Sequence, residues 1–366
     1  MDPANEFSTP IVTLAEWMGS KAPPNTPRPA VVVIPGAGGG TGSRANNSGH
    51  HGRYDSGCEM DDEENSDLVT ISSEVTNIIW ENGRRYHSYK EGRYPFPNDP
   101  LEQEREEILH HLFEKLLGGR LHMTSLDNPQ TILDLGTGVG RWAVCMGYLY
   151  EDAVITGLDL SPIQDRYIPP NVGFVIDDIE DTWVDPPGSL DFVFCRNMST
   201  SIRDWKRLFR QAYNAVSPGG WIEVQDLHWA FRCDDGTMPA DWAPSILIDK
   251  IREGLRAMGI EMFAPTMHVH HAEAVGFTNL NATARRIPVG AWARDSELKD
   301  IGRLVRDVLC VGLHGMAIGP LTRGLGWSPE RVQLFLVQVR EGLMDHSVHA
   351  CIYFHCLSAQ KRLGSN

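Results

Sequence analysis

The most constraining feature of this chain is an apolar run that turns through three glycines, Thr131-Ile-Leu-Asp-Leu-Gly-Thr-Gly-Val-Gly-Arg-Trp142. The pattern predicts a buried strand over 131–135 and a helix that reaches about residue 150. Gly136, Gly138 and Gly140 allow a tight turn and let a ligand approach the backbone without interference from a Cβ atom. This stretch therefore predicts an α/β sheet with a ligand at the end of its first strand.

The glycine spacing narrows the choice of ligand. A dinucleotide fingerprint requires a glycine at position 141, where this chain has Arg141. The spacing Asp-x-Gly-x-Gly-x-Gly from Asp134 instead favours a nucleoside ligand without a pyrophosphate. S-adenosylmethionine is such a ligand, because it carries an ammonium, a carboxylate and a sulfonium in place of phosphates. A dehydrogenase, which would need a dinucleotide site, is consequently disfavoured and ranks third among the functional interpretations.

Strands and helices alternate along the rest of the chain. A helix is expected to start at Asp99, its N-cap, with Pro100 and Glu102 in its first turn, and to end at Gly118-Gly119. Further strands are predicted over 153–158, 173–176, 192–195, 221–225, 277–286 and 348–356, and helices over 204–216, 245–258, 296–318 and 329–343. This alternation predicts a doubly wound, mostly parallel sheet of the α/β class.

Composition limits the class of protein. The chain has 366 residues and a formal charge of −15, which argues against a generic phosphate-binding surface and gives no indication of direct nucleic-acid binding. Its seven cysteines are scattered without a CxxC pair, which is typical of reduced thiols. No apolar run reaches the roughly 20 residues that a membrane span needs, and the N-terminus lacks a signal-peptide pattern. We therefore expect a cytoplasmic or nuclear protein.

Two regions differ in composition. Residues 1–73 are rich in Pro, Gly, Ser and Asn and are predicted to be disordered or weakly ordered. Within them, Val31-Val-Val-Ile-Pro-Gly-Ala-Gly-Gly-Gly-Thr-Gly42 resembles a strand and a phosphate loop, but no helical pattern follows, so we predict no nucleotide site there. Residues 74–366 are expected to form the folded domain, with an N-terminal helical lid over about 74–120.

Acidic residues follow three of the predicted strands, where an open sheet binds its ligand. Asp159 closes the second strand and is expected to accept hydrogen bonds from ribose hydroxyls; the alternative is a helix cap or turn acid. One member of the pair Asp177–Asp178 is expected at an adenine amino group, and the other is expected to be a solvated loop acid. Asp134 is predicted to orient the glycine loop or to meet the ligand ammonium, against a purely structural role in the turn.

Other candidates carry more evenly balanced alternatives. Arg196 ends the fourth strand, either beside the ligand or as a structural arginine. His228 follows the fifth strand and is the candidate general base, although a structural role is the stronger alternative. His268, His270 and His271 suggest a metal site only weakly, because strand-like alternation would place His268 and His270 alone on one side, and no metal is predicted. The aromatic residues near the start of the domain are either core or site walls: Tyr86, Tyr89, Tyr94 and Phe96.

Several of these motifs together resemble one family. Glu81-Asn-Gly-Arg-Arg-Tyr-His87, the glycine loop with Trp142, Asp159-Leu-Ser-Pro-Ile-Gln164, Ser217-Pro-Gly-Gly-Trp221, Trp327-Ser-Pro-Glu330 and Val348-His-Ala350 are similar to the LaeA-like class I S-adenosylmethionine-dependent methyltransferases of filamentous fungi. The resemblance spans roughly residues 74–361. It implies a seven-stranded sheet whose last strand is antiparallel. It also implies cofactor binding by Gly136, Gly138, Asp159 and the Asp177–Asp178 turn. The cofactor site that we predict further includes Tyr86, Asp134, Thr137, Leu160 and Arg196.

The resemblance leaves two functional hypotheses. The first is a methyltransferase of fungal secondary metabolism that acts on a small molecule or another acceptor. The second is a cofactor-binding interaction module of a transcriptional complex, since the family includes a nuclear regulator that works with velvet-domain partners. The chain departs from that regulator at Arg141, where an apolar residue is usual, and over 196–202, which replaces a segment bearing Gly and Cys.

Overall fold

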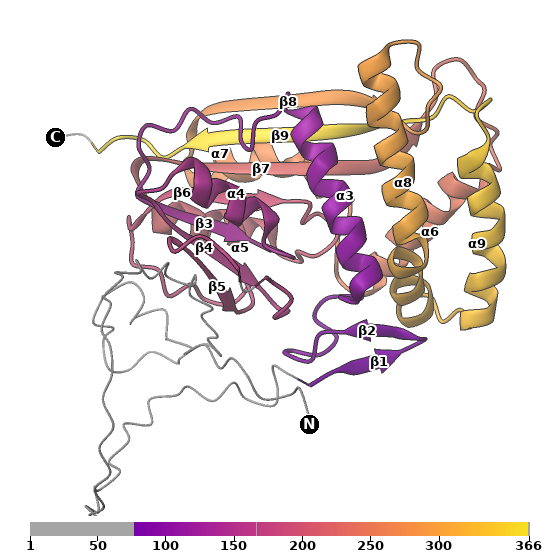
Figure 1. Ribbon diagram of the computed structural model, residues 1–366, viewed down its shortest axis with the longest axis horizontal. Helices are drawn as coiled ribbons and strands as arrows, with labels where there is room; N and C mark the ends of the chain where they lie inside the picture. The colour runs from indigo at the N-terminus through magenta and orange to yellow at the C-terminus, as the bar shows by residue number, and fades with distance from the viewer. Residues whose placement is uncertain (1–76, 166, 365–366) are drawn as a thin grey trace, which may run out of the picture.

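A seven-stranded sheet forms the centre of the computed structural model, which describes residues 77–165 and 167–364 (Figure 1). Its strands lie in the order β5-β4-β3-β6-β7-β9-β8. Their bounds are β3 Thr131–Leu135, β4 Val154–Asp159, β5 Val172–Ile176, β6 Leu190–Arg196, β7 Val216–Arg232, β8 Thr278–Pro288 and β9 Cys351–Gln360. The predictions of disorder over 1–73 and of no nucleotide loop over 31–42 lie outside the described residues.

The sheet is parallel except for its last strand in the chain. β3, β4, β5, β6 and β7 pair in parallel, whereas β9 runs antiparallel to both of its neighbours, β7 and β8. The predicted doubly wound, mostly parallel sheet with an antiparallel last strand is therefore confirmed. The strand order places the topological switch point between β3 and β6. The ends of these two strands carry the glycine loop and Arg196.

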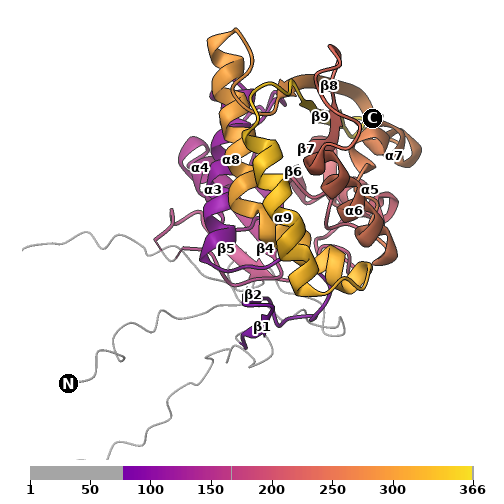
Figure 2. The same ribbon diagram turned by 90° about the vertical axis from the view of Figure 1, so that its right-hand side faces the viewer.

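Helices cover both faces of the sheet. On one face, α3 (Pro100–Leu116), α6 (Ala243–Ala257), α8 (Ser296–Gly319) and α9 (Pro329–Met344) build a core with β7 and β9, and α4 (Arg141–Leu149) packs beside them on β3 to β6. On the other face, α5 (Trp205–Ala215) and α7 (His268–Val275) cover β6 and β7 (Figure 2). The side chains of each strand alternate between these two cores, as pleating requires.

Helix α3 begins as its sequence predicts. Asp99 accepts a hydrogen bond from the backbone N–H of Glu102, and Pro100 occupies the first turn. The same carboxylate also receives two hydrogen bonds from Arg84, at 2.5 and 2.8 Å. The N-cap of α3 is thus fixed by a buried ion pair to the preceding hairpin. α3 in turn lies over the ends of the strands that carry the glycine loop (Figure 1).

The predicted lid contains helix α3 and, before it, a β-hairpin that was not predicted, β1 (Ile79–Glu81) and β2 (Arg84–Tyr86), in which Asn82-Gly83 supplies the two positive φ angles of a tight turn. Two predictions of local structure were wrong. β7 continues to Arg232, seven residues beyond its predicted end at 225, and β9 pairs with it as far as His228 and, after an irregularity in register, at Arg232. Residues 268–271 are helical, so strand alternation does not describe the three histidines.

The segment Ser296–Gly324, which comprises α8 and the following turns, is long and apolar enough to cross a membrane by length and composition. In its most apolar window 61% is buried inside the protein. Its residues Val305, Val308 and Leu309 lie in the core that α3 and α9 share. The apolar composition of this segment is therefore explained by its place as a core helix.

Candidate active site

The glycine loop connects β3 to α4 and is closely packed by two side chains. Gly138 has φ of +57°, and a Cβ atom there would lie 2.5 Å from an Oε atom of Glu106. Gly136 has φ of +70°, and its Cβ would collide with the sulfur of Met198. Both positions therefore favour glycine because of their left-handed backbone conformation.

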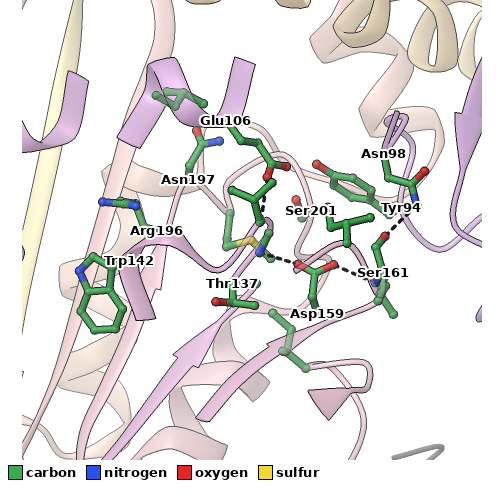
Figure 3. Close-up of a pocket in the computed structure, with 18 of the residues that line it drawn as sticks. Tyr94, Asn98, Glu106, Thr137, Trp142, Asp159, Ser161, Arg196, Asn197 and Ser201 are labelled. Carbon is green, nitrogen blue, oxygen red and sulfur yellow. Dashed lines mark hydrogen bonds between the residues drawn. The ribbon is translucent and has the colours of Figure 1, made fainter. Parts of the chain in front are cut away.

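A pocket lies above this loop, between the sheet edge and the segment that leads into α3 (Figure 3). It encloses about 1040 Å³, counting the part that is open to solvent. Its lining includes eight of the predicted site residues: Gly136, Thr137, Gly138, Asp159, Leu160, Asp177, Asp178 and Arg196. Tyr94, Asn98, Glu106, His110 and Phe113, from α3 and the segment before it, and Trp142 of α4 also line the pocket. The structure therefore gathers residues from four strand ends and from α3 around one cavity.

Asp159 lies at the end of β4, directly beside the glycine loop. Its two carboxylate oxygens accept hydrogen bonds at 2.9 Å from the backbone N–H groups of Gly138 and Ser161. Burial raises the pKa of Asp159 to about 6, against the lowering effect of these hydrogen bonds. The carboxylate is held in place and still faces the cavity, as ribose recognition requires.

Asp177 and Asp178 are bound by a segment that we call the strap, residues 89–93. The carboxylate of Asp178 is buried and forms ion pairs with Lys90 at 3.3 Å and Arg93 at 3.0 Å. The hydroxyl of Tyr89 donates to Asp177 at 3.4 Å. Asp178 is buried beneath the strap, so it is not the solvated loop acid that was predicted for one member of the pair, whereas Asp177 is half-buried. Since Asp178 is committed to two cations, Asp177 is the better placed of the two for an adenine amino group.

Three of the predicted site residues do not line the pocket. Asp134 is buried beneath the loop, where it accepts a hydrogen bond of 2.6 Å from the Thr137 hydroxyl and so orients the loop. Tyr86 lies in the hairpin, with the Arg323 guanidinium 4.7 Å from its ring centroid.

The third such residue is His228, the candidate base. Because β7 stays extended, its side chain points with Asp226 to the α7 face of the sheet, away from α3. His228 contacts Phe263 and His355 there, and burial lowers its pKa to about 4. The structure gives this histidine a structural setting rather than access to the pocket.

Sequence reasoning missed two residues of α3 that face the pocket. Glu106 accepts a hydrogen bond of 3.1 Å from the backbone N–H of Val139, on the glycine loop. Burial, opposed by Arg105, raises the pKa of Glu106 to about 8. His110 lies one turn further along and contacts Arg196. Glu106 and His110 are four positions apart, on the helix face that also carries Leu109 and Phe113. This spacing was the signal available in the sequence, because it places both polar groups on the buried side of α3.

The aromatic residues near the start of the domain divide between the two predicted roles. Tyr94 lines the pocket, and burial raises the pKa of its hydroxyl well above the usual value. Phe96 belongs to the core. Among the described residues, no group of three or more His, Cys, Asp or Glu side chains could hold a metal ion. His268 instead contacts Asp226 at 3.1 Å within the core.

Comparison with known proteins agrees with this geometry. A family model described as a methyltransferase domain matches residues 104–282. Methyltransferase pytC of Aspergillus terreus is 41% identical over 299 residues, which cover 81% of this chain and 92% of that protein. The secondary metabolism regulator LAE1 of Cochliobolus heterostrophus is 33% identical over 307 residues, covering 81% of this chain and 98% of that protein.

Similarity to solved structures is more distant. Phosphoethanolamine N-methyltransferase 2 of Haemonchus contortus, in complex with S-adenosyl-L-methionine, is 16% identical with a TM-score of 0.41. The match covers 71% of this chain and 52% of that protein, so the chain spans about half of its length.

Proposed function

This chain belongs to the fungal LaeA-like family of class I S-adenosylmethionine-dependent methyltransferases, and on that premise we propose that it methylates a small-molecule acceptor of secondary metabolism. The observation that carries the proposal is the pocket above Gly136 and Gly138, with Asp159 beside them and α3 closing it from above. The enclosure favours an acceptor that enters the cavity over one that is presented at the surface.

The residues present fit S-adenosylmethionine. Gly136 and Gly138 line the pocket without a Cβ atom, and the side chains that lie against them are those of Met198 and Glu106. Asp159 offers fixed carboxylate oxygens for a ribose, and Asp177 offers another acceptor at the next strand end. Of the described arginines that line the pocket, Arg93, Arg105 and Arg141 are each paired with carboxylates.

When bound, the cofactor supplies an electrophilic methyl group on a sulfonium. The protein's part is to align the reacting groups and to exclude water. Gly136, Gly138 and Asp159 fix the ligand's position at the sheet edge. Leu109 and Phe113 form the apolar part of the opposite wall, and the Tyr94 hydroxyl stays protonated and available as a hydrogen-bond donor. Alignment and desolvation by these residues would be the main contribution of the protein to a displacement at a methyl group.

Calorimetric titration with S-adenosylhomocysteine tests the cofactor site. We expect Asp159→Ala to weaken binding by about 1–3 kcal/mol, since a charged hydrogen-bond acceptor for the ribose is lost. Asp165→Ala removes an exposed acid of the same loop and should bind like the wild type. Unchanged affinity in Asp159→Ala, or no binding by the wild type, would contradict the proposal.

The acceptor can be found by mass spectrometry. An extract of the fungus that makes this protein is incubated with the protein and with S-adenosylmethionine that carries a trideuterated methyl group. We expect one small molecule to gain that group in a wild-type reaction and not in an Asp159→Ala reaction. Labelling of proteins alone would count against a small-molecule acceptor.

We also propose a second function, which the 33% identity to a secondary metabolism regulator favours. In that case the chain binds its cofactor and acts in the nucleus as an interaction module with a velvet-domain protein. Co-purification of a velvet-domain protein from fungal nuclei, together with no small-molecule labelling, would support this function over tailoring chemistry.

A further inference from the structure

Arg196 carries a charge that no protein carboxylate neutralises directly. It ends β6 and lines the pocket, and it forms no ion pair within the part of the chain that the structure describes. Its guanidinium lies over the rings of Phe113 and Phe194, at 5.1 and 5.9 Å from their centroids. Burial lowers the pKa of Arg196 to about 10, so the group is still a cation at neutral pH. A cation in such surroundings is a site for an anion.

His110 holds this guanidinium in position. Its Nδ1 atom lies 2.9 Å from Nη2 of Arg196. Burial and the neighbouring Arg196 lower the pKa of His110 to about 4, so the ring is neutral and Nδ1 accepts the hydrogen bond. One nitrogen of Arg196 is thereby used, and the rest of its planar fork is available to a carboxylate in the cavity.

The position of Arg196 along the sheet edge indicates which ligand carboxylate its guanidinium can reach. The strand order β4-β3-β6 places Asp159, the glycine loop and Arg196 in a row, and Figure 3 shows Asp159 and Arg196 on either side of Thr137. Two strand spacings are roughly 10 Å. That is about the reach from the ribose of S-adenosylmethionine to the carboxylate at the end of its amino-acid tail. Glu106 lies above the loop between them.

We propose that Arg196, oriented by His110, binds the carboxylate of the cofactor's amino-acid tail and that Glu106 accepts the adjacent ammonium. The inference rests on the proposed function, because it assumes that the ligand of the glycine loop is S-adenosylmethionine. His110 is a positioning residue, since it acts through Arg196. A carboxylate on the methyl acceptor is the other source of the same chemistry, and the test separates the two.

The test compares two ligands that differ only in the carboxylate. S-adenosylhomocysteine and its decarboxylated analogue are titrated by calorimetry into the wild type and Arg196→Gln. We expect Arg196→Gln to lower the affinity for S-adenosylhomocysteine about 10- to 100-fold and to leave the affinity for the decarboxylated analogue within about twofold. His110→Ala should show a smaller loss of affinity that is again selective for S-adenosylhomocysteine. Arg196→Lys should recover part of the affinity that Arg196→Gln loses.

Arg303→Gln is the matched control. Arg303 lies on α8, outside the residues that line the pocket, and its guanidinium is paired with Asp300 at 2.8 Å, so both affinities should stay unchanged. Equal losses for both ligands in Arg196→Gln, or no loss for either, would overturn the inference. Unchanged S-adenosylhomocysteine binding with a raised KM for the acceptor would assign Arg196 to an acceptor carboxylate instead. Failure of the wild type to bind either ligand would overturn the proposed function itself.

Discussion

At the scale of single residues, the pocket depends on polar groups that are costly to bury without a ligand. Asp134, Asp159 and Glu106 all have raised pKa values, and burial is the main cause in each case. Below its pKa of about 8, Glu106 is largely protonated and accepts a cation poorly. A ligand ammonium should therefore bind most strongly to the ionised form, with release of a proton.

Glu106 makes cofactor affinity depend on pH. Between pH 6.5 and 8.5 we expect the affinity for S-adenosylhomocysteine to rise about ten- to thirtyfold, as a carboxyl with a pKa near 8 becomes ionised. Glu106→Gln cannot ionise and should show a much flatter profile, and Glu107→Gln is the matched control on the neighbouring position. Calorimetry in buffers of different ionisation enthalpy measures both the affinity and the proton release. A wild-type profile as flat as that of Glu106→Gln would contradict this role.

Single residues were also where sequence reasoning was least complete. Asp159 could be predicted because it follows an apolar strand at a recognisable distance from the glycine loop. Glu106 and His110 could not, because nothing in a helical pattern says which polar residue of a mostly buried face meets a ligand. His228 was predicted to follow the end of its strand, but the strand continues for four more residues, to Arg232. The side chain of His228 therefore points to the face of the sheet that α7 covers, away from α3.

At the scale of elements, α3 links the N-terminal hairpin to the active site. Its first turn is fixed by Asp99 and Arg84, and its second and third turns present Glu106 and His110 to the pocket. Its start could be read from Asp99, Pro100 and Glu102. The strap could not be predicted, because its position depends on ion pairs with Asp178, 88 and 85 positions away from Lys90 and Arg93. The position of the hairpin could not be predicted either, because its Glu81 pairs with Arg323, 242 positions away.

Loss of the Asp99 carboxylate should affect more than helix capping. We expect Asp99→Ala to lower the free energy of unfolding by about 3–5 kcal/mol, because it leaves the buried Arg84 charge unpaired. Asp295→Ala removes an exposed N-cap of α8 and should cost only about 1 kcal/mol. Urea unfolding followed by circular dichroism compares the two variants. Equal losses would show that the Arg84 pair contributes little.

At the scale of the whole molecule, the candidate cofactor site touches both main parts of the fold. Its floor is the edge of the parallel sheet, and its roof is α3, which packs on α8 in a separate core. The sheet and its last antiparallel strand could be predicted, because alternating apolar runs and the family motifs extend over most of the chain. The closure of the site could not, because it follows from how two distant layers pack.

A ligand that bridges these layers should stabilise the folded domain as a unit. At a concentration 100 times its Kd, S-adenosylhomocysteine should add about 2.7 kcal/mol to the free energy of unfolding. For a domain of this size we expect Tm to rise by roughly 3–8 °C. Differential scanning calorimetry should show one transition moving as a whole. A shift in only part of a split transition would mean that the roof and the sheet unfold separately.

The place of β9 has a consequence for how the protein is made. β9 comprises residues Cys351–Gln360, yet it lies inside the sheet, between β7 and β8. During synthesis, β8 has no strand to join until β9 has left the ribosome, and β7 keeps an open edge for the same time. Unpaired edges of this kind recruit other chains. A nascent chain halted shortly before Cys351 would therefore be prone to aggregate, although every residue of its active site had already been made.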